Sequence, residues 1–203
     1  TTCKIIEKIT GITLAHYVDS VFFKPLGMTN TMYNPPERLW SRVMPTEVDT
    51  IWRKTGTAVH GTVHDENAWV LGGVSGHAGL FSTAPNLAVL LQMELNGGVY
   101  GGKRYLKEDV LRKFTTRQSP KSSRGIGWDT KTSPRGWSGK LLSEETWLHT
   151  GFTGTSVVTD PTRNLIVVFL TNRVYPTRES QKIGSVRPKV HDAIVRALIQ
   201  EQK

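Results

Sequence analysis

The 203-residue sequence predicts a mixed α/β (α+β) fold in which an antiparallel β-sheet is flanked by helices. Amphipathic helical stretches lie at both ends of the chain, glycine-rich loops lie between them, and two β-branched runs flank a proline-containing turn. The hydrophobic content of 37% suits a globular domain with its own core. No run approaches the ~18 consecutive apolar residues of a membrane span.

Two short helices are expected first. Residues 4–10 have the pattern of the last turns of an amphipathic helix, which Gly11 ends. Thr13 is suited to cap a second helix, because apolar residues recur at helical spacing over residues 14–22. The proline and glycine of residues 25–27 end that helix.

The middle of the chain is mostly loop with two helices. Residues 30–60 show weak periodicity and predict a long surface excursion, and the glycines of residues 72–81 predict a tightly folded loop. A leucine-rich helix is expected over residues 83–95 and a shorter one over 106–114. Residues 125–128 are expected to form a short strand.

The carboxyl-terminal part predicts a hairpin followed by a helix. Residues 147–161, which include His149-Thr150-Gly151, are expected to form one continuous strand, and residues 165–173 a second one after a proline-containing turn, which is typical of a β-hairpin. Residues 188–200 are expected to form the last helix. Its inward side chains are then Val190, Ile194, Ala197 and Leu198.

The net charge and the single cysteine exclude few classes of function. The formal charge is +9, but the basic residues are spread from Lys4 to Lys203 without a block of five, so we assign them to the solvated surface and predict no nucleic-acid partner. Cys3 is expected to be a helical core thiol. His60 and His64 leave two interpretations open, a metal site and a hydrogen-bonded loop. We favour the loop and predict no metal, because the residues between them form helix poorly.

His77, Asp65 and Glu66 also carry alternatives. His77 lies between glycines, as a loop-packing residue or as part of a cleft wall, and packing is the favoured interpretation. Asp65 and Glu66 are adjacent, which rarely gives the opposed geometry of a general acid and base.

Five motifs occur in the order of a known superfamily. They are F-K-P-L-G-M at 23–28, V-H-D-E-N-A at 63–68, G-H-A-G-L-F-S-T-A at 76–84, H-T-G at 149–151 and T-N-R-V-Y-P at 171–176. The sequence resembles the serine β-lactamase and penicillin-binding protein superfamily, and within it the class C β-lactamase-like serine hydrolases. The resemblance spans nearly all of residues 4–200.

The resemblance implies a sheet flanked by helices, an all-helical subdomain and a serine that is acylated by an amide or ester and released by water. No serine has a lysine three residues later, and no tyrosine has an asparagine two residues later, so the S-x-x-K and Y-x-N boxes are absent from these 203 residues. We therefore expect an N-terminally truncated, C-terminal portion of one hydrolase domain. Its helical and loop part covers about 1–140, and its hairpin and last helix cover about 141–203.

The resemblance also assigns site residues. His149 corresponds to the Lys or His that lines the site, Thr150 to the hydroxyl that binds a substrate carboxylate or carbonyl, and Gly151 to the position of close approach. The backbone N–H of Phe152 corresponds to one oxyanion donor. A histidine in place of lysine suggests an esterase or peptidase more than an efficient β-lactamase. Asn172, Arg173 and Arg178 are candidates for binding a substrate carboxylate, with exposed loop residues as the alternative.

Two functions follow as hypotheses. The first is a fragment of a serine acyl-hydrolase (β-lactamase, esterase or D,D-peptidase) that acts on a small-molecule or peptide-like acyl substrate, with peptidoglycan-derived substrates among the candidates. This chain alone would be inactive and would need no cofactor. The second is a non-catalytic module of the same fold that binds cell-envelope material or a protein partner. We further expect localisation in the periplasm or cell envelope, and self-association through uncovered sheet edges.

Overall fold

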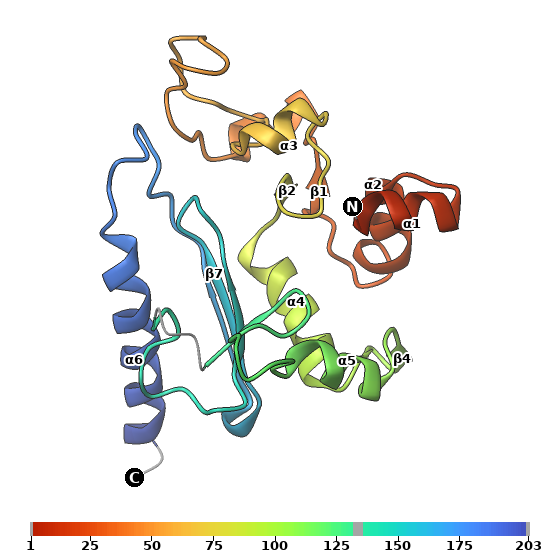
Figure 1. Cartoon of the computed structure of the whole chain (residues 1–203), viewed down its shortest axis with the longest axis vertical. Helices are drawn as coiled ribbons and strands as arrows, with labels where there is room; N and C mark the ends of the chain where they lie inside the picture. The colour runs from red at the N-terminus through yellow and green to blue at the C-terminus, as the bar shows by residue number, and fades with distance from the viewer. Residues whose placement is uncertain (1, 132–135, 202–203) are drawn as a thin grey trace. The chain divides into compact units, whose positions relative to one another are not determined.

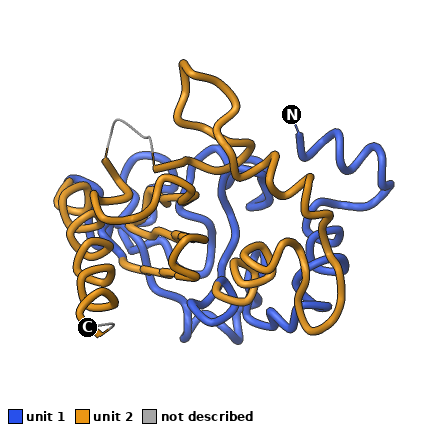
Figure 2. The backbone as a smooth tube through the Cα atoms, turned by 90° about the horizontal axis from the view of Figure 1, so that it is seen from below, with its two compact units in different colours: residues 1–87, 172–179 blue, residues 88–171, 180–203 orange. Residues whose placement is uncertain are grey.

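The computed structural model describes residues 2–131 and 136–201. The chain divides into two compact units, residues 1–87 with 172–179 and residues 88–171 with 180–203 (Figure 2). We call them unit 1 and unit 2. Among the described helices, none combines the length and the apolar character needed to span a membrane.

Unit 2 contains the predicted sheet. Its four antiparallel strands are, in spatial order, β5 (Asp129–Thr130), β6 (Trp147–Thr150), β7 (Ser156–Asp160) and β8 (Leu165–Phe169). The hairpin of β7 and β8 turns through a 3-10 helix, Pro161–Arg163, and through Asn164, which has a left-handed φ of 48°. The predicted turn at residues 161–164 is therefore confirmed, but the predicted continuous strand 147–161 is divided into β6 and β7 by a second turn, which the Gly151 N–H closes on Thr155 O.

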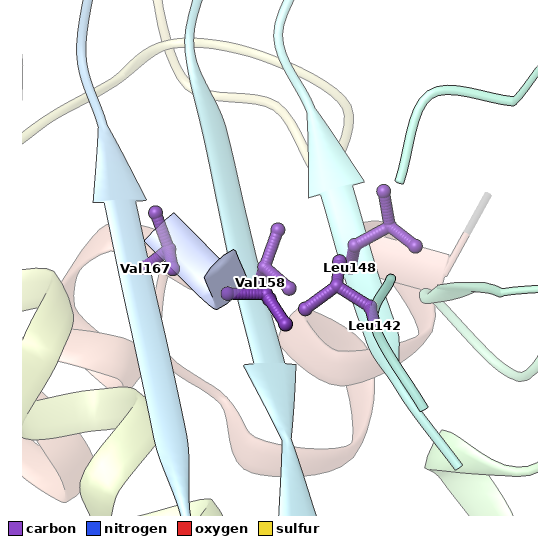
Figure 3. Packing of buried hydrophobic residues seen from close by; sticks show 5 residues of the cluster. Leu142, Leu148, Val158 and Val167 are labelled. Carbon is purple, nitrogen blue, oxygen red and sulfur yellow. The ribbon is translucent and has the colours of Figure 1, made fainter. Parts of the chain in front are cut away.

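One face of this sheet carries the core of unit 2. In the strand register Leu148 lies opposite Val158, and Val158 lies opposite Val167, so the three side chains align across β6, β7 and β8 (Figure 3). They pack with Leu142 and with Val195 of α6 (Ile183–Glu201). This face is thus covered by α6, which runs alongside the sheet (Figure 1).

The other face is covered by a different helix. Side chains alternate across a strand, so Trp147 points away from the face of Leu148. The Trp147 indole Nε1 donates to Glu94 of α4 (Ala84–Leu95) over 3.3 Å. The remaining elements of unit 2 are the β3–β4 hairpin (Val99–Tyr100 and Lys103–Arg104) and α5 (Glu108–Thr115).

Unit 1 is built from short elements. In chain order they are α1 (Thr2–Thr10), α2 (Leu14–Val18), a π-helix (Asp19–Phe23), β1 (Met32–Tyr33), a 3-10 helix (Glu37–Arg42), α3 (Glu66–Val70) and β2 (Leu80–Phe81), with β2 paired to β1. Gly11 ends α1 with a φ of 74°, and the Thr13 hydroxyl accepts the N–H of His16 as the cap of α2. Both predicted helix boundaries are confirmed.

Three further predictions of local structure are wrong. Residues 125–128 form a turn, with Gly127 at a φ of 81°, and the strand begins only at Asp129. The last helix begins at Ile183, not at Pro188. Pro188 lacks only its own N–H donor. The helical turn before it still forms, because the N–H groups of Ser185 and Val186 donate to Lys182 O. Ala197 is exposed, and Val195 and His191 are buried in its place.

Candidate active site

His149 lies at the end of β6, on the sheet face that also carries Trp147. Its side chain is exposed, and its ring meets that of Trp128 edge-on, with 6.4 Å between the ring centroids. The ring is thus oriented by an aromatic neighbour while it stays accessible to a ligand.

The surroundings of His149 favour the neutral imidazole. Partial desolvation of the ring by the residues around it, together with the positive charge of Arg124, lowers the pKa of His149 below its ordinary 6.5. At neutral pH the ring therefore offers a lone pair and one N–H. It can accept a proton or a hydrogen bond, but it does not present a fixed positive charge.

The turn after β6 is tightly hydrogen-bonded. The Gly151 N–H donates to Thr155 O over 2.8 Å, and the Gly154 N–H donates to Gly151 O over 3.1 Å. A Cβ at Gly151 would collide with the Thr155 hydroxyl, so a larger residue here would force the Thr155 side chain to move. Close approach of a ligand to Gly151 stays a prediction. Phe152 is exposed at the tip of the turn.

A buried arginine that the sequence analysis missed supports this turn. Arg187 of α6 donates from Nη2 to Gly151 O over 2.7 Å. One turn further along α6, His191 lies 3.3 Å from the Ser156 hydroxyl at the start of β7. One face of α6 contains three buried polar residues at i, i+4 and i+5, namely Arg187, His191 and Asp192. This spacing is the signal in the sequence that could have identified them as a polar face that supports the sheet.

The other three predicted residues lie together in unit 1. Asn172 donates from Nδ2 to Pro45 O over 2.6 Å, and Arg173 donates from Nη1 to Arg178 O over 2.7 Å. Arg178 donates from Nε to both carboxylate oxygens of Glu47, over 2.8 and 2.6 Å, and its Nη2 pairs with Glu47 and with Glu66. The Arg178 charge is therefore balanced by two carboxylates of the same unit.

This ion-pair group shifts the titration of its members. Hydrogen bonds from Arg178 hold the pKa of Glu47 below its ordinary value even though Glu47 is buried. Burial lowers the pKa of His64, whose Nε2 lies 3.5 Å from Glu47. His60 instead faces the carbonyl oxygens of Trp40 and Val43. No metal-binding group of three ligands occurs among residues 2–131 and 136–201.

His77 corrects an expectation. Its side chain is 51% exposed, not packed, and it bridges Ser75 and Asp65. The neighbouring carboxylates diverge, because Asp65 caps α3 and bonds to His77 while Glu66 pairs with Arg178. Adjacent carboxylates thus serve two separate clusters.

The family of the chain is decided by comparison. A family model described as Beta-lactamase matches residues 3–187. The chain belongs to the β-lactamase family. Two of its relatives are described as putative D-alanyl-D-alanine carboxypeptidases, from Salmonella heidelberg (38% identity) and Salmonella gallinarum (37% identity). Each match covers 89% of this chain and 45% of the relative, so this β-lactamase-family chain spans about half the length of the curated relatives it matches.

Solved structures agree on the fold. A β-lactamase from Mycobacterium bovis superposes with a TM-score of 0.66 at 19% identity, over 96% of this chain and 60% of that one. A penicillin-binding protein homologue from Caulobacter crescentus gives 0.61 at 16% identity, over 93% and 55%. Simvastatin synthase from Aspergillus terreus gives 0.65 at 15% identity, over 98% and 52%. At these identities the likeness shows that this β-lactamase-family chain shares the fold.

Proposed function

We propose that this chain forms one wall of the acyl-transfer site of a serine hydrolase that cleaves amide or ester bonds through an acyl-serine intermediate. The observation that carries the proposal is the accessible His149–Thr150 end of β6, followed by a tight turn, in a chain matched by the β-lactamase family model. The names of the relatives favour a D-alanyl-D-alanine peptide, and hence peptidoglycan in the cell envelope, as the substrate.

Each residue of the wall has a distinct role in this proposal. Neutral His149 accepts or relays a proton, and the Thr150 hydroxyl donates a hydrogen bond to the substrate carboxylate or carbonyl. The Phe152 N–H donates to the oxyanion, where the loss of one donor typically costs ~10²–10³ in rate. Asn172, Arg173 and Arg178 belong to unit 1 and stay separate candidates for binding a carboxylate, which would have to compete with Glu47 and Glu66 for Arg178.

The nucleophile is assigned to polypeptide beyond these 203 residues, because no S-x-x-K box occurs within them. Removing a catalytic serine typically lowers kcat by ~10⁶. We therefore propose that the 203-residue chain by itself does not turn over the substrate by the acyl-serine mechanism. We further propose self-association through the edge of the sheet at β8, where no other described strand pairs, and light scattering measures it.

The test compares the isolated chain with the product of its whole reading frame. We expect an S-x-x-K box upstream of Thr1, labelling of the long product by a fluorescent penicillin, and release of D-alanine from an N-acyl-D-alanyl-D-alanine peptide. The isolated chain should show neither reaction. A reading frame without the box, or penicillin labelling of the isolated chain, overturns the proposal, and the first outcome would favour a non-catalytic binding module.

A substitution tests the wall itself. In the long product Thr150→Val should lower kcat/KM by about 10–100-fold, the equivalent of one hydrogen bond to a charged group. Thr162→Val is the matched control, because Thr162 lies on the β7–β8 turn at the other end of the hairpin and should leave kcat/KM unchanged. Equal kcat/KM values in the two variants would exclude Thr150 from the site.

A further inference from the structure

A second cluster of catalytic side-chain types lies in unit 1, away from the β6 turn in sequence. The Ser75 hydroxyl lies 2.7 Å from Nδ1 of His77, and Nε2 of His77 lies 2.9 Å from Oδ1 of Asp65. Ser75 and His77 belong to the glycine-rich loop of residues 72–79, and Asp65 is the residue before α3. A hydroxyl, an imidazole and a carboxylate are therefore hydrogen-bonded in series.

The protons in this series can be assigned. Burial opposes ionisation of Asp65, but hydrogen bonds from the Ala68 N–H and from His77 outweigh it and lower the pKa of Asp65. A carboxylate only accepts, so Nε2 of a neutral His77 carries the proton and donates it to Asp65. Nδ1 then holds a lone pair, and the Ser75 hydroxyl must donate to it.

This is the order of groups that activates a serine. The base accepts the hydroxyl proton, and the carboxylate fixes the tautomer and orientation of the base. The loop is anchored as well, because the Tyr33 hydroxyl donates to Ser75 O over 2.9 Å. Serine nucleophiles commonly use the N–H of the following residue as an oxyanion donor. The corresponding Gly76 N–H donates to no protein acceptor among the residues that the structure describes.

Access limits what can react. Gly76 and His77 are exposed, but Ser75 itself is only 7% exposed. A side chain at Gly76 would also collide with Cys3, whose Sγ would lie 2.5 Å from an added Cβ. Only a small, activated acyl or phosphoryl group can reach the Ser75 hydroxyl past this loop.

We propose that Ser75, His77 and Asp65 form a second acyl-transfer site, distinct from the H-T-G wall, that takes small activated esters. The Ser75 hydroxyl oxygen attacks the ester carbonyl carbon, and its proton passes to Nδ1 of His77. The bond to the alcohol oxygen breaks, and the alcohol leaves with the proton from His77. Water, deprotonated by the same nitrogen, then releases the acid and restores the Ser75 hydroxyl.

This site does not depend on the missing lysine box. The residue three places after Ser75 is Ala78, so the base is an imidazole held by a carboxylate and not a lysine on the same helix. The 203-residue chain contains every group that the reaction needs. Failure of the penicillin test would therefore leave this proposal intact, and its own failure would leave the H-T-G wall intact.

The test uses diisopropyl fluorophosphate with the 203-residue protein, followed by peptide mass spectrometry. Phosphorylation forms the bond from Ser75 oxygen to phosphorus and expels fluoride, while His77 takes the proton. We expect one diisopropylphosphoryl group on Ser75. His77→Gln, which keeps a hydrogen-bonding side chain but not the base, should slow labelling by ~10²–10⁴. Asp65→Asn keeps an acceptor for capping α3 but should also slow labelling.

Ser82→Ala is the matched control, because the Ser82 hydroxyl pairs with Thr31 and not with an imidazole. It should be labelled at the wild-type rate. Thermal unfolding of every variant checks that the fold is retained. The proposal is overturned if folded protein is not labelled, if the label lies on another residue, or if His77→Gln is labelled at Ser75 as fast as the wild type.

Discussion

The β6–β8 sheet of unit 2 and the ion-pair group around Arg178 in unit 1 are held together by opposite means. The sheet aligns Leu148, Val158 and Val167 in a dry face and closes through backbone hydrogen bonds between neighbouring strands. The Arg178 group (Glu47, His64, Glu66 and Arg178) joins α3 to loop segments through the ion pairs of Arg178 with Glu47 and Glu66, with His64 beside Glu47. The apolar face of Leu148, Val158 and Val167 should resist changes of pH and salt, and the Arg178 group should depend on both.

The largest effect is expected in the sheet core. Leu148 is fully buried in β6, so Leu148→Ala should lower the free energy of unfolding by about 3–4 kcal/mol through lost burial and a residual cavity. Urea denaturation measures it. Leu170→Ala is the matched control, because Leu170 is 40% exposed just after β8 and should cost far less. Comparable losses in both variants would show that the aligned face is not the core of unit 2.

Unit 2 also contains a buried carboxyl group, that of Glu94, whose ionisation lowers the stability of the folded protein. Burial raises the pKa of Glu94 from an ordinary 4.5 to about 7. The folded protein thus holds a proton that the unfolded chain releases, so stability falls as the pH rises from about 4.5 to 7 and is level above that. At ~1.4 kcal/mol per pH unit over the interval from 4.5 to about 7, the loss is at most about 3–4 kcal/mol.

Glu94→Gln should remove this dependence and still accept the Trp147 hydrogen bond. Denaturation at pH 5 and pH 8 should then give nearly equal free energies for the variant and a lower value at pH 8 for the wild type. Glu144→Gln, at an exposed position of the same unit, is the control and should keep the wild-type slope. An unchanged slope in Glu94→Gln would mean that Glu94 ionises normally.

The Arg178 group should show the opposite dependence on pH. Because the pKa of Glu47 is lowered, its contribution is present above about pH 4.5 and is lost as the pH falls through the folded-state pKa. Arg178→Ala leaves Glu47 buried without its main partner. We expect a loss of about 2 kcal/mol at pH 7, less than for a fully buried pair because the Arg178 side chain is 38% exposed.

Arg42→Ala supplies the control for this variant, since Arg42 is exposed at the end of the 3-10 helix. Denaturation at pH 7 and pH 4 should separate the two: the destabilisation by Arg178→Ala is largest at pH 7 and begins to shrink at pH 4, while Arg42→Ala follows the wild type at both. A loss that is equal at both pH values would show that Arg178 acts through packing and not through charge.

The comparison also explains what the sequence could predict. The turn between β7 and β8 was predictable because the β-branched runs on either side of it are local in the chain. The composition of such a run indicates a strand without any knowledge of distant residues. Arg178 meets Glu47 and Glu66 across 131 and 112 positions, and no local pattern marks such partners. Likewise Ser75, His77 and Asp65 were visible singly, but only the fold of the glycine-rich loop brings them together.

The prediction of the buried face of the last helix was wrong for a related reason. Hydrophobic periodicity placed Ala197 inward, yet the buried face contains Arg187, His191 and Val195. Buried polar residues do not register in a pattern of apolar residues, because their burial depends on partners such as Gly151 and Ser156 on distant strands. The H-T-G residues were assigned through the order of the motifs, which carries family information that periodicity lacks, and their role in the site stays a prediction.

The smallest predicted effect tests whether an ion pair in unit 1 stabilises the fold only when it is buried, or whether an exposed pair stabilises it equally. Lys24 and Asp19 lie 2.6 Å apart, but their side chains are exposed and screened by solvent. Lys24→Ala should change the free energy of unfolding by about 0.5 kcal/mol or less. Measured beside Arg178→Ala in the same buffer, it compares two short ion pairs that differ in exposure. If Lys24→Ala cost as much as Arg178→Ala, desolvation of Glu47 would not be the source of the larger effect.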